Sequence, residues 1–308
     1  MTDQLDRPDQ LTTAQVCAVL DLVATATATD GAAPLSEHGM LRVRHNVPGQ
    51  GHDVLVTGSE EMAGYGYLEP QAEEHEAAGE LVIRPARRRQ GLGTALARAL
   101  VAAAGEEPLR VWAHGDLPAA AALARSMGFE RFRALWQLRR SLDEPLATPA
   151  FPPGTTLRTF LVGQDEDEWL RLNGKAFAKH PEQGSWSRRD LELREAEPWF
   201  DPDGFFIAER DDAMVGFHWT KVHQTEDGGL GEVYVVGVDP DAHGGGIGRA
   251  LTLAGLRYLR EQGLRQVMLY ADEDNLGAIA MYQNLGFTRW HTDAMYRRPG
   301  EAKRPPDR

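Results

Sequence analysis

Two stretches of the chain repeat one pattern of apolar and polar positions. In each, a short β-branched run reaches a proline, crosses a glycine-rich polar loop and enters an alanine- and leucine-rich segment; the first run covers 81–85 and the second 236–240. The two prolines lie 155 residues apart, and so do Gly91 and Gly246. The pattern predicts a strand, a turn and a helix in both places, and its repetition predicts two copies of one domain.

The rest of the chain alternates between strand and helix patterns. Thr12 and Gln15 have the spacing of a capping box and predict a helix that runs to about Thr29. Alternation, or short β-branched runs between turn residues, predicts strands at 41–46, 54–57, 65–69, 80–83, 109–113, 132–138, 156–160, 205–209, 215–222, 231–238, 266–270 and 287–296. Further helices are predicted after each glycine loop, to about 104 and 262, at 119–127, 166–177 and 275–285, and after Ser187. The segments 71–79, 180–184 and 201–204 are predicted to be loops.

The order of these elements predicts an α/β fold, with an α+β type of mixed sheet in each of two tandem domains. Four prolines between 141 and 156 mark a linker. We therefore expect an N-terminal domain over 1–142, a linker over 143–155, a C-terminal domain over 156–298 and a disordered tail over 299–308.

Composition narrows the function without defining it. The chain has 308 residues and a formal net charge of −13, which argues against a duplex nucleic acid as partner because phosphate binding needs a basic face. The first residues lack a secretory pattern, and no run of about 18 apolar residues predicts a membrane span. The single cysteine, Cys17, excludes an intramolecular disulfide and favours a reducing compartment. We expect a cytoplasmic monomer with no nucleic-acid or membrane partner, and Cys17, in an apolar segment, to be buried.

Each glycine loop has the composition of a phosphate-binding turn. The order is R-x-x-G-x-G ending at Gly93 in the first repeat and H-x-x-G-x-G ending at Gly248 in the second. Glycines let backbone N–H groups approach an anion, and the following helix adds its unpaired N–H groups and its dipole. A turn that only ends a strand is the alternative for one copy, but two copies at a fixed spacing favour phosphate binding. The dinucleotide fingerprint and the Walker loop need other glycine orders, which are absent.

Taken together, these motifs resemble the GNAT acetyltransferase superfamily. A strand, a proline, an R/Q-x-x-G-x-G/A loop and a helix are followed by a second helix that ends in Gly128-Phe129 or Gly286-Phe287. The similarity covers both repeats and is densest from about 173 to 287, with runs such as GFHWTKVH at 216–223 and GLGEVYVVGV at 229–238.

The resemblance implies acetyl-coenzyme A as cosubstrate, with one site in each domain and no metal. The strand backbone would pair with the pantetheine arm, and the loop would hold the pyrophosphate. The implied cofactor residues are Leu81, Val82, Ile83, Arg88, Arg89, Gln90, Gly91, Leu92 and Gly93 in the first repeat, and Val236, Gly237, Val238, His243, Gly244, Gly245, Gly246, Ile247, Gly248, Arg249 and Asn275 in the second. His243 stands where Arg or Gln is usual, which removes a permanent charge but leaves the backbone cradle.

Acetyl transfer to an amine needs a base for the amine proton and an acid for the leaving thiolate. An α-amino group has a pKa of about 7.7–8.0, so much of it is charged at neutral pH. The second repeat offers Glu232 as base and Tyr282 as acid, whereas the first repeat has Ala77 and Ala124 at the same offsets. From the residues alone, a solvated carboxylate and a core aromatic are the alternatives. The resemblance implies the catalytic roles, so we expect the C-terminal domain to be catalytic and the N-terminal domain only to bind cofactor.

The long runs at 216–223 and 229–238 resemble one narrower family of tandem GNAT acetyltransferases, and this closer resemblance implies an acceptor, the cysteinyl amine of a cysteinyl-glucosaminyl-inositol pseudodisaccharide thiol. Its expected ligands are Glu37, Glu182, Lys221, Glu232 and Tyr270, and a role for Glu37 would place the acceptor between the two domains. A snorkelling surface lysine is the alternative for Lys221. Three other functions stay open: acetylation of another small amine such as an aminoglycoside, acetylation of a protein N-terminal amine, and non-catalytic sensing of acetyl-coenzyme A.

Three histidines, His180, His218 and His223, raise the question of a metal site. His218 and His223 are five residues apart on a predicted strand, which puts their side chains on opposite faces. Without a cysteine cluster as well, we expect no metal.

Overall fold

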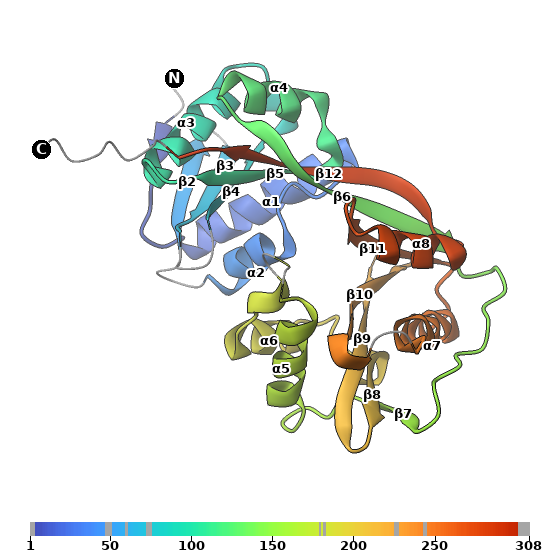
Figure 1. Ribbon diagram of the computed structural model, residues 1–308. Coiled ribbons are helices and arrows are strands. Elements are labelled where there is room, and N and C mark those ends of the chain that lie inside the picture. Colours follow the sequence, from blue (N-terminus) through green and yellow to red (C-terminus); the bar gives the residue numbers. More distant parts are fainter. Residues whose placement is uncertain are drawn as a thin grey trace, which may run out of the picture. The chain divides into compact units, whose positions relative to one another are not determined.

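The computed structural model describes residues 4–46, 51–58, 61–71, 76–178, 180, 183–224, 228–242 and 245–300. The chain forms two compact units: the first comprises Met1–Leu135 and His291–Arg308, and the second Trp136–Trp290. Figure 1 labels their elements in chain order. From residue 301 on, the predicted tail 299–308 lies outside the described residues.

The first unit is a mixed sheet between helices. Its sheet order is β1-β2-β3-β4-β5-β12, and all the neighbouring strands are antiparallel except the parallel pair β4 and β5. The elements are β1 (Gln4–Asp6), α1 (Thr13–Asp30), α2 (Glu37–His45), β2 (His52–Thr57), β3 (Met62–Glu69), β4 (Ala77–Ile83), α3 (Leu92–Ala104), β5 (Leu109–Ala113), α4 (Pro118–Ser126), the first half of β6 (Glu130–Ser141) and, near the end of the chain, most of β12 (Thr288–Arg298).

Alternation along the strands divides the first unit's core into two layers. Val54 and Val56 of β2 pack in one apolar cluster with Leu96 of α3, whereas Leu55 between them packs in another cluster with Leu22 of α1. Successive strand side chains point to opposite faces, so α1 and α3 cover opposite faces of the sheet.

The second unit repeats this arrangement. Its sheet order is β6-β11-β10-β9-β8-β7. The elements are the second half of β6 (Glu130–Ser141), β7 (Thr155–Thr159), α5 (Glu166–Ala176), α6 (Arg188–Glu195), β8 (Phe205–Arg210), β9 (Ala213–His223), β10 (Leu230–Val238), α7 (Ile247–Glu261), β11 (Gln266–Asp272) and α8 (Leu276–Asn284). An aromatic cluster around Trp169 of α5 and Trp219 of β9 fills one side of the sheet, and leucines of α7 pack on the other.

Most elements lie where the sequence predicts them, and the capping box of α1 forms: the backbone N–H of Thr12 donates to Gln15 Oε1 at 2.8 Å. The strand predicted at 41–46 is wrong, because this segment is the helix α2, whose N-terminus is capped by Ser36. The loop predicted at 71–79 is wrong at its end, since β4 already begins at Ala77. Cys17 is exposed rather than buried, because α1 turns Val19, Leu22, Val23 and Ala26 to the core instead.

His114, directly after β5, joins two carboxylates of the first unit. Its Nδ1 lies 3.2 Å from Asp293 Oδ2, and its Nε2 lies 3.4 Å from Glu80 Oε1. Asp293 also accepts the backbone N–H of Gly115 at 2.7 Å, and Glu80 accepts that of Ser36 at 3.0 Å. Burial alone would lower the pKa of His114, but the hydrogen bonds to Asp293 and Glu80 outweigh burial and raise it to about 10. This network therefore ties β12 and the start of α2 to the centre of the sheet.

Alkaline pH should weaken the first unit through this network. Because the folded pKa of His114 is raised to about 10, its contribution to the free energy of unfolding is full below the ordinary pKa of about 6.5 and is lost as the pH rises towards the folded value. We expect His114→Gln to remove this pH dependence, measured from urea unfolding midpoints on both sides of neutrality. The exposed His52→Gln is the control; a slope that His114→Gln leaves unchanged would contradict this role.

Candidate functional site

In both units the strand before the glycine loop parts from its parallel neighbour. In the described part of the chain, β4 pairs with β5 only over its first three residues, Ala77 to Gly79. Likewise β10 pairs with β11 only at Gly231 and Glu232. Beyond these points each strand remains paired on its other side, with β3 or β9. The open edge carries backbone N–H and C=O groups to which an extended amide chain can add as a further strand.

The glycine loops lead from these edges into helices, whose first N–H groups have no partner within the helix itself. Gly91 and Gly246 are the N-cap residues of α3 and α7, and their φ angles are 84° and 80°. A Cβ atom at either position would meet nothing within 4 Å, so the left-handed backbone rather than space demands glycine. The helix N-terminal N–H groups that follow suit an anion. His243 and Gly244 lie outside the described residues.

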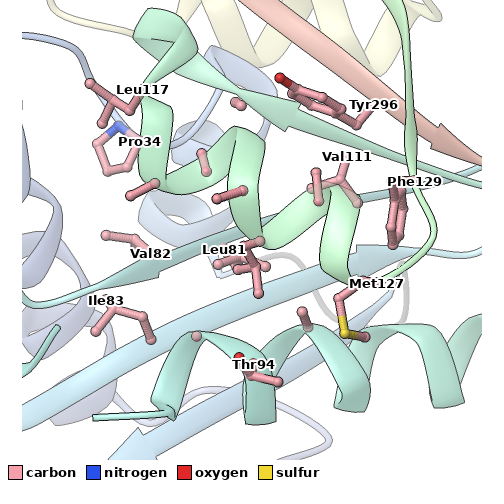
Figure 2. A pocket seen from close by; sticks show the side chains of 18 of the residues that line it. Pro34, Leu81, Val82, Ile83, Thr94, Val111, Leu117, Met127, Phe129 and Tyr296 are labelled. Atoms are coloured by element: carbon pink, nitrogen blue, oxygen red, sulfur yellow. The ribbon is translucent and has the colours of Figure 1, made fainter. Parts of the chain in front are cut away.

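In the first unit, a cavity of about 600 Å³ opens on the free edge of β4 (Figure 2). Seven of the nine predicted cofactor residues line it: Leu81, Val82, Ile83, Arg88, Arg89, Gly91 and Gly93. Of the other two, Gln90 accepts a hydrogen bond from Arg87 at 3.3 Å, and Leu92 packs against the core. The Arg88 guanidinium donates to both carboxylate oxygens of Asp30 at 2.7 Å, which anchors the loop to the end of α1.

The corresponding cavity of the second unit is smaller, about 260 Å³. Five predicted cofactor residues line it: Val238, Gly246, Ile247, Gly248 and Arg249. Val236 and Gly237 belong to the part of β10 that still pairs with β9 but no longer with β11, and Gly245 directly precedes the cap glycine. The Asn275 side chain caps α8 by accepting the backbone N–H of Ala278 at 3.1 Å, so it has a structural task as well.

Glu232 lies where β10 and β11 part. It is buried, with 7% of its surface exposed, and stands opposite Lys221 in the register of β10 and β9. Its Oε2 lies 2.6 Å from Nε2 of His223, whose side chain is 33% exposed. The Lys221 ammonium lies over the rings of Trp199 and Tyr234, at 4.2 and 4.9 Å from their centroids. The buried carboxylate of Glu232 is therefore connected to solvent through the partly exposed imidazole of His223, which could carry a proton between them.

Tyr282 is a buried side chain of α8. Its ring lies edge-on to Phe287, with the centroids 5.7 Å apart. Burial raises the pKa of the Tyr282 hydroxyl, so the group keeps its proton at neutral pH. It can therefore donate a proton but cannot act as a resting base.

The predicted acceptor ligands are distributed over several elements. Tyr270 of β11 is 41% exposed, and its hydroxyl accepts a hydrogen bond from Gln137 Nε2 at 2.8 Å; Gln137 Oε1 in turn accepts from Arg139 Nε at 2.8 Å. Glu37 is the first residue of α2 in the first unit. Glu182 lies outside the described residues.

Two side chains near the predicted site were not predicted as part of it, His223 and Gln137. The alternation of β9 places His223 on the same face as Lys221, and the facing strand brings that face to Glu232. The spacing of Lys221 and His223 in the sequence indicates their shared face. The contact with Glu232 could be inferred only once the register of β9 against β10 was known. Gln137 belongs to the first repeat in sequence and to the second unit in space, which no local pattern shows.

His218 belongs to the core of the second unit. His218 is fully buried against Gly255, and its Nδ1 lies 2.8 Å from the carbonyl of Leu251. Burial lowers the pKa of His218 to about 4, so the ring is neutral. Among the described residues, no three His, Cys, Asp or Glu side chains gather closely enough to hold a metal ion. In the same part of the chain, no helix has the length and apolarity of a membrane span.

Comparison with known proteins agrees with this geometry. A model of the acetyltransferase (GNAT) family matches residues 168–287, and one of the acetyltransferase (GNAT) domain matches 50–131. A tandem GNAT protein from the clavulanic acid biosynthesis pathway has the same fold, with a TM-score of 0.73 over 96% of this chain and 98% of that one, at 24% identity. A GCN5-related N-acetyltransferase from Sphaerobacter thermophilus is 26% identical, with a TM-score of 0.69 over 96% of both chains.

Two GNAT domains in one chain, each with an open strand edge and a glycine cradle, define a tandem acetyltransferase of the GNAT superfamily. The chain is 55% identical to the mycothiol acetyltransferase of Thermobispora bispora over 91% of its length and 95% of the relative's, and 53% identical to that of Thermomonospora curvata over 94% and 96%. It belongs to the mycothiol acetyltransferase family. The predicted family and fold class are confirmed, and the chain is an acetyltransferase whose donor is acetyl-coenzyme A.

Proposed function

We propose that the chain acetylates the cysteinyl amine of the cysteinyl-glucosaminyl-inositol pseudodisaccharide, which completes mycothiol. Relatives named mycothiol acetyltransferase, at 53–55% identity over more than nine tenths of the chain, support this acceptor. The observation that carries the chemistry is the place of Glu232, the last residue of β10 that pairs with β11, where the open edge begins. A buried carboxylate there adjoins the edge along which the pantetheine arm would lie.

Glu232 is proposed as the general base. It takes the proton of the cysteinyl ammonium, directly or through one water, so that the neutral amine can attack. His223, in contact with Glu232 at 2.6 Å and partly exposed, is proposed to hold the carboxylate in place and to pass its proton on to solvent. His223 acts through Glu232 and is therefore a positioning residue.

Tyr282 is proposed as the general acid. When bound, acetyl-coenzyme A supplies an activated thioester, and a protonated Tyr282 hydroxyl supplies the proton that the departing thiolate needs. A backbone N–H of the open edge near Val236 is proposed to stabilise the developing charge on the carbonyl oxygen. Both donors belong to elements fixed by the core, so little reorganisation accompanies the reaction.

The acceptor is proposed to be held by Lys221, Tyr270 and Glu182 together with Glu232, and a role for Glu37 stays a prediction. A pseudodisaccharide presents many hydroxyls, and charged or hydroxyl side chains recognise them by hydrogen bonds. Tyr270 supports this part best, since Gln137 and Arg139 fix its exposed hydroxyl in one direction.

The N-terminal domain is proposed to hold a second molecule of acetyl-coenzyme A without turning it over. Its open β4 edge, its cradle and its cavity match those of a cofactor site. Ala77 and Ala124 stand where the second repeat has Glu232 and Tyr282, and alanine can neither take nor give a proton. We further propose that the protein works as a monomer in the cytoplasm, where its single thiol, exposed at Cys17, would remain reduced.

A thiol-release assay tests the acceptor. Purified protein is mixed with acetyl-coenzyme A and, in separate reactions, the pseudodisaccharide, free cysteine, an aminoglycoside or a peptide with a free N-terminus. We expect coenzyme A release with the pseudodisaccharide to exceed that with each other acceptor by at least about a hundredfold in kcat/KM, because a site with several buried polar groups penalises a ligand that leaves them unpaired. Faster release with the aminoglycoside or the peptide would keep the chemistry and reject the proposed acceptor.

A further inference from the structure

The two cofactor cavities differ in size for a reason visible in the sequence. Aligned on Gly128 and Gly286, the helices α4 and α8 place Ala121 opposite Ile279 and Ala124 opposite Tyr282. Two large side chains of the second repeat are thus methyl groups in the first.

In the second unit these two side chains fill the interior. Ile279 and Tyr282 are 5% and 6% exposed and belong to the same apolar cluster as Phe287. The cavity beside the glycine cradle measures about 260 Å³, and neither of these two side chains lines it.

In the first unit the space at Ala124 stays open, whereas Ala121 is buried in the core and does not line the cavity. Its cavity measures about 600 Å³ and extends from the cradle to Met127 and Phe129, the latter being the counterpart of Phe287. Figure 2 shows Ile83 and Leu117 towards one end of the lining and Met127 and Phe129 towards the other. An unfilled apolar volume of this kind is destabilising, so a folded protein gains when an apolar group occupies it.

We propose that the N-terminal cavity binds a coenzyme A thioester whose acyl chain is longer than acetyl. The inference rests on the proposed cofactor site of this domain and deepens it. The cradle and the open edge of β4 fix the phosphate and pantetheine parts, as in the second unit. If Tyr282 lies beside the thioester sulfur, the space freed at Ala124 lies beside it too. A straight acyl chain from that point enters a pocket lined by Leu100, Leu109, Val111, Met127 and Phe129.

Burial of each further methylene should raise affinity by about fourfold, until the cavity is full. Two added methylenes, as in butanoyl-coenzyme A, should therefore raise the affinity about fifteenfold over acetyl-coenzyme A, and hexanoyl-coenzyme A should bind tighter again. The first domain has alanines at both catalytic offsets, so it would retain such a thioester rather than consume it.

Calorimetric titration of the full chain tests this. Gly248→Trp fills the second cradle, so that acetyl-, butanoyl- and hexanoyl-coenzyme A report on the first site alone. Ala124→Tyr restores the residue of the second repeat at a position that lines the cavity, and Ala102→Tyr, on the exposed side of α3, is the matched control. Ala124→Val, the smaller change, guards against a folding failure of Ala124→Tyr, and thermal unfolding of each free variant checks its fold.

In the Gly248→Trp protein, with or without Ala102→Tyr, we expect the longer thioesters to bind more tightly than acetyl-coenzyme A. Ala124→Tyr and Ala124→Val in the same protein should lower hexanoyl affinity, at least about tenfold for Ala124→Tyr, with little change for acetyl. If the Gly248→Trp protein binds all three thioesters with equal affinity, the proposal is overturned, but the first domain is still a cofactor site. If the Gly248→Trp protein binds none of the three thioesters, the first domain is not a coenzyme A site, and both proposals fail.

Discussion

Replacing Glu232 by glutamine should lower kcat by about 10²–10⁴-fold, the usual contribution of a positioned general base. Glutamine keeps the size of the side chain and a hydrogen-bonding oxygen for His223, 2.6 Å from the carboxylate in the parent. It cannot accept the amine proton. Stopped-flow or steady-state thiol release with saturating acceptor measures the loss, and fluorescence titration measures acetyl-coenzyme A affinity, which should change by less than about threefold because Glu232 only supplies a proton acceptor.

The control for this variant is Glu261→Gln, an exposed carboxylate at the end of α7, for which we expect parental kinetics. Unchanged kcat in Glu232→Gln would remove Glu232 from the proposed mechanism. A large loss of cofactor affinity with normal unfolding would point instead to a role of the carboxylate in shaping the open edge.

Much of the fold could be predicted because both repeats follow local rules. The β-branched runs that became β4 and β10, the prolines after them and the cap glycines Gly91 and Gly246 all act through short-range sterics. The strand predicted at 41–46 was wrong because a helix cap and a tertiary contact outweigh the local alternation there. Leu41 and Val43 alternate with arginines as in a strand, but Ser36 caps a helix, and a bidentate ion pair with Asp53 holds the charge of Arg42, which this helix buries.

The site could be predicted only as far as the repeat and the family resemblance reach. Comparing equal offsets in the two copies separated Glu232 and Tyr282 from Ala77 and Ala124. The contact of His223 with Glu232 depends on the register of β9 against β10, and so lay beyond any single segment. The buried His114 depends on Asp293, 179 residues away, for its charge.

Replacing Tyr282 by phenylalanine should lower kcat by roughly a hundredfold, since the departing thiolate must then take its proton from water. Phenylalanine retains the ring that lies against Phe287, so the core and the free energy of unfolding should change little. Because burial keeps the Tyr282 hydroxyl protonated across the neutral range, the loss should be the same from about pH 6 to pH 9. Rates of thiol release at saturating substrates across that range measure it.

Tyr258→Phe is the matched control: it removes the hydroxyl that Tyr258 of α7 donates to Asp201, away from the proposed transfer site. We expect it to affect unfolding more than turnover, the reverse of Tyr282→Phe. Full turnover in Tyr282→Phe would mean that water protonates the thiolate in the parent as well. The contrast between Tyr282 and Ala124 would then reflect packing alone, and the alanines of the first repeat would indicate a larger cavity without indicating lost catalysis.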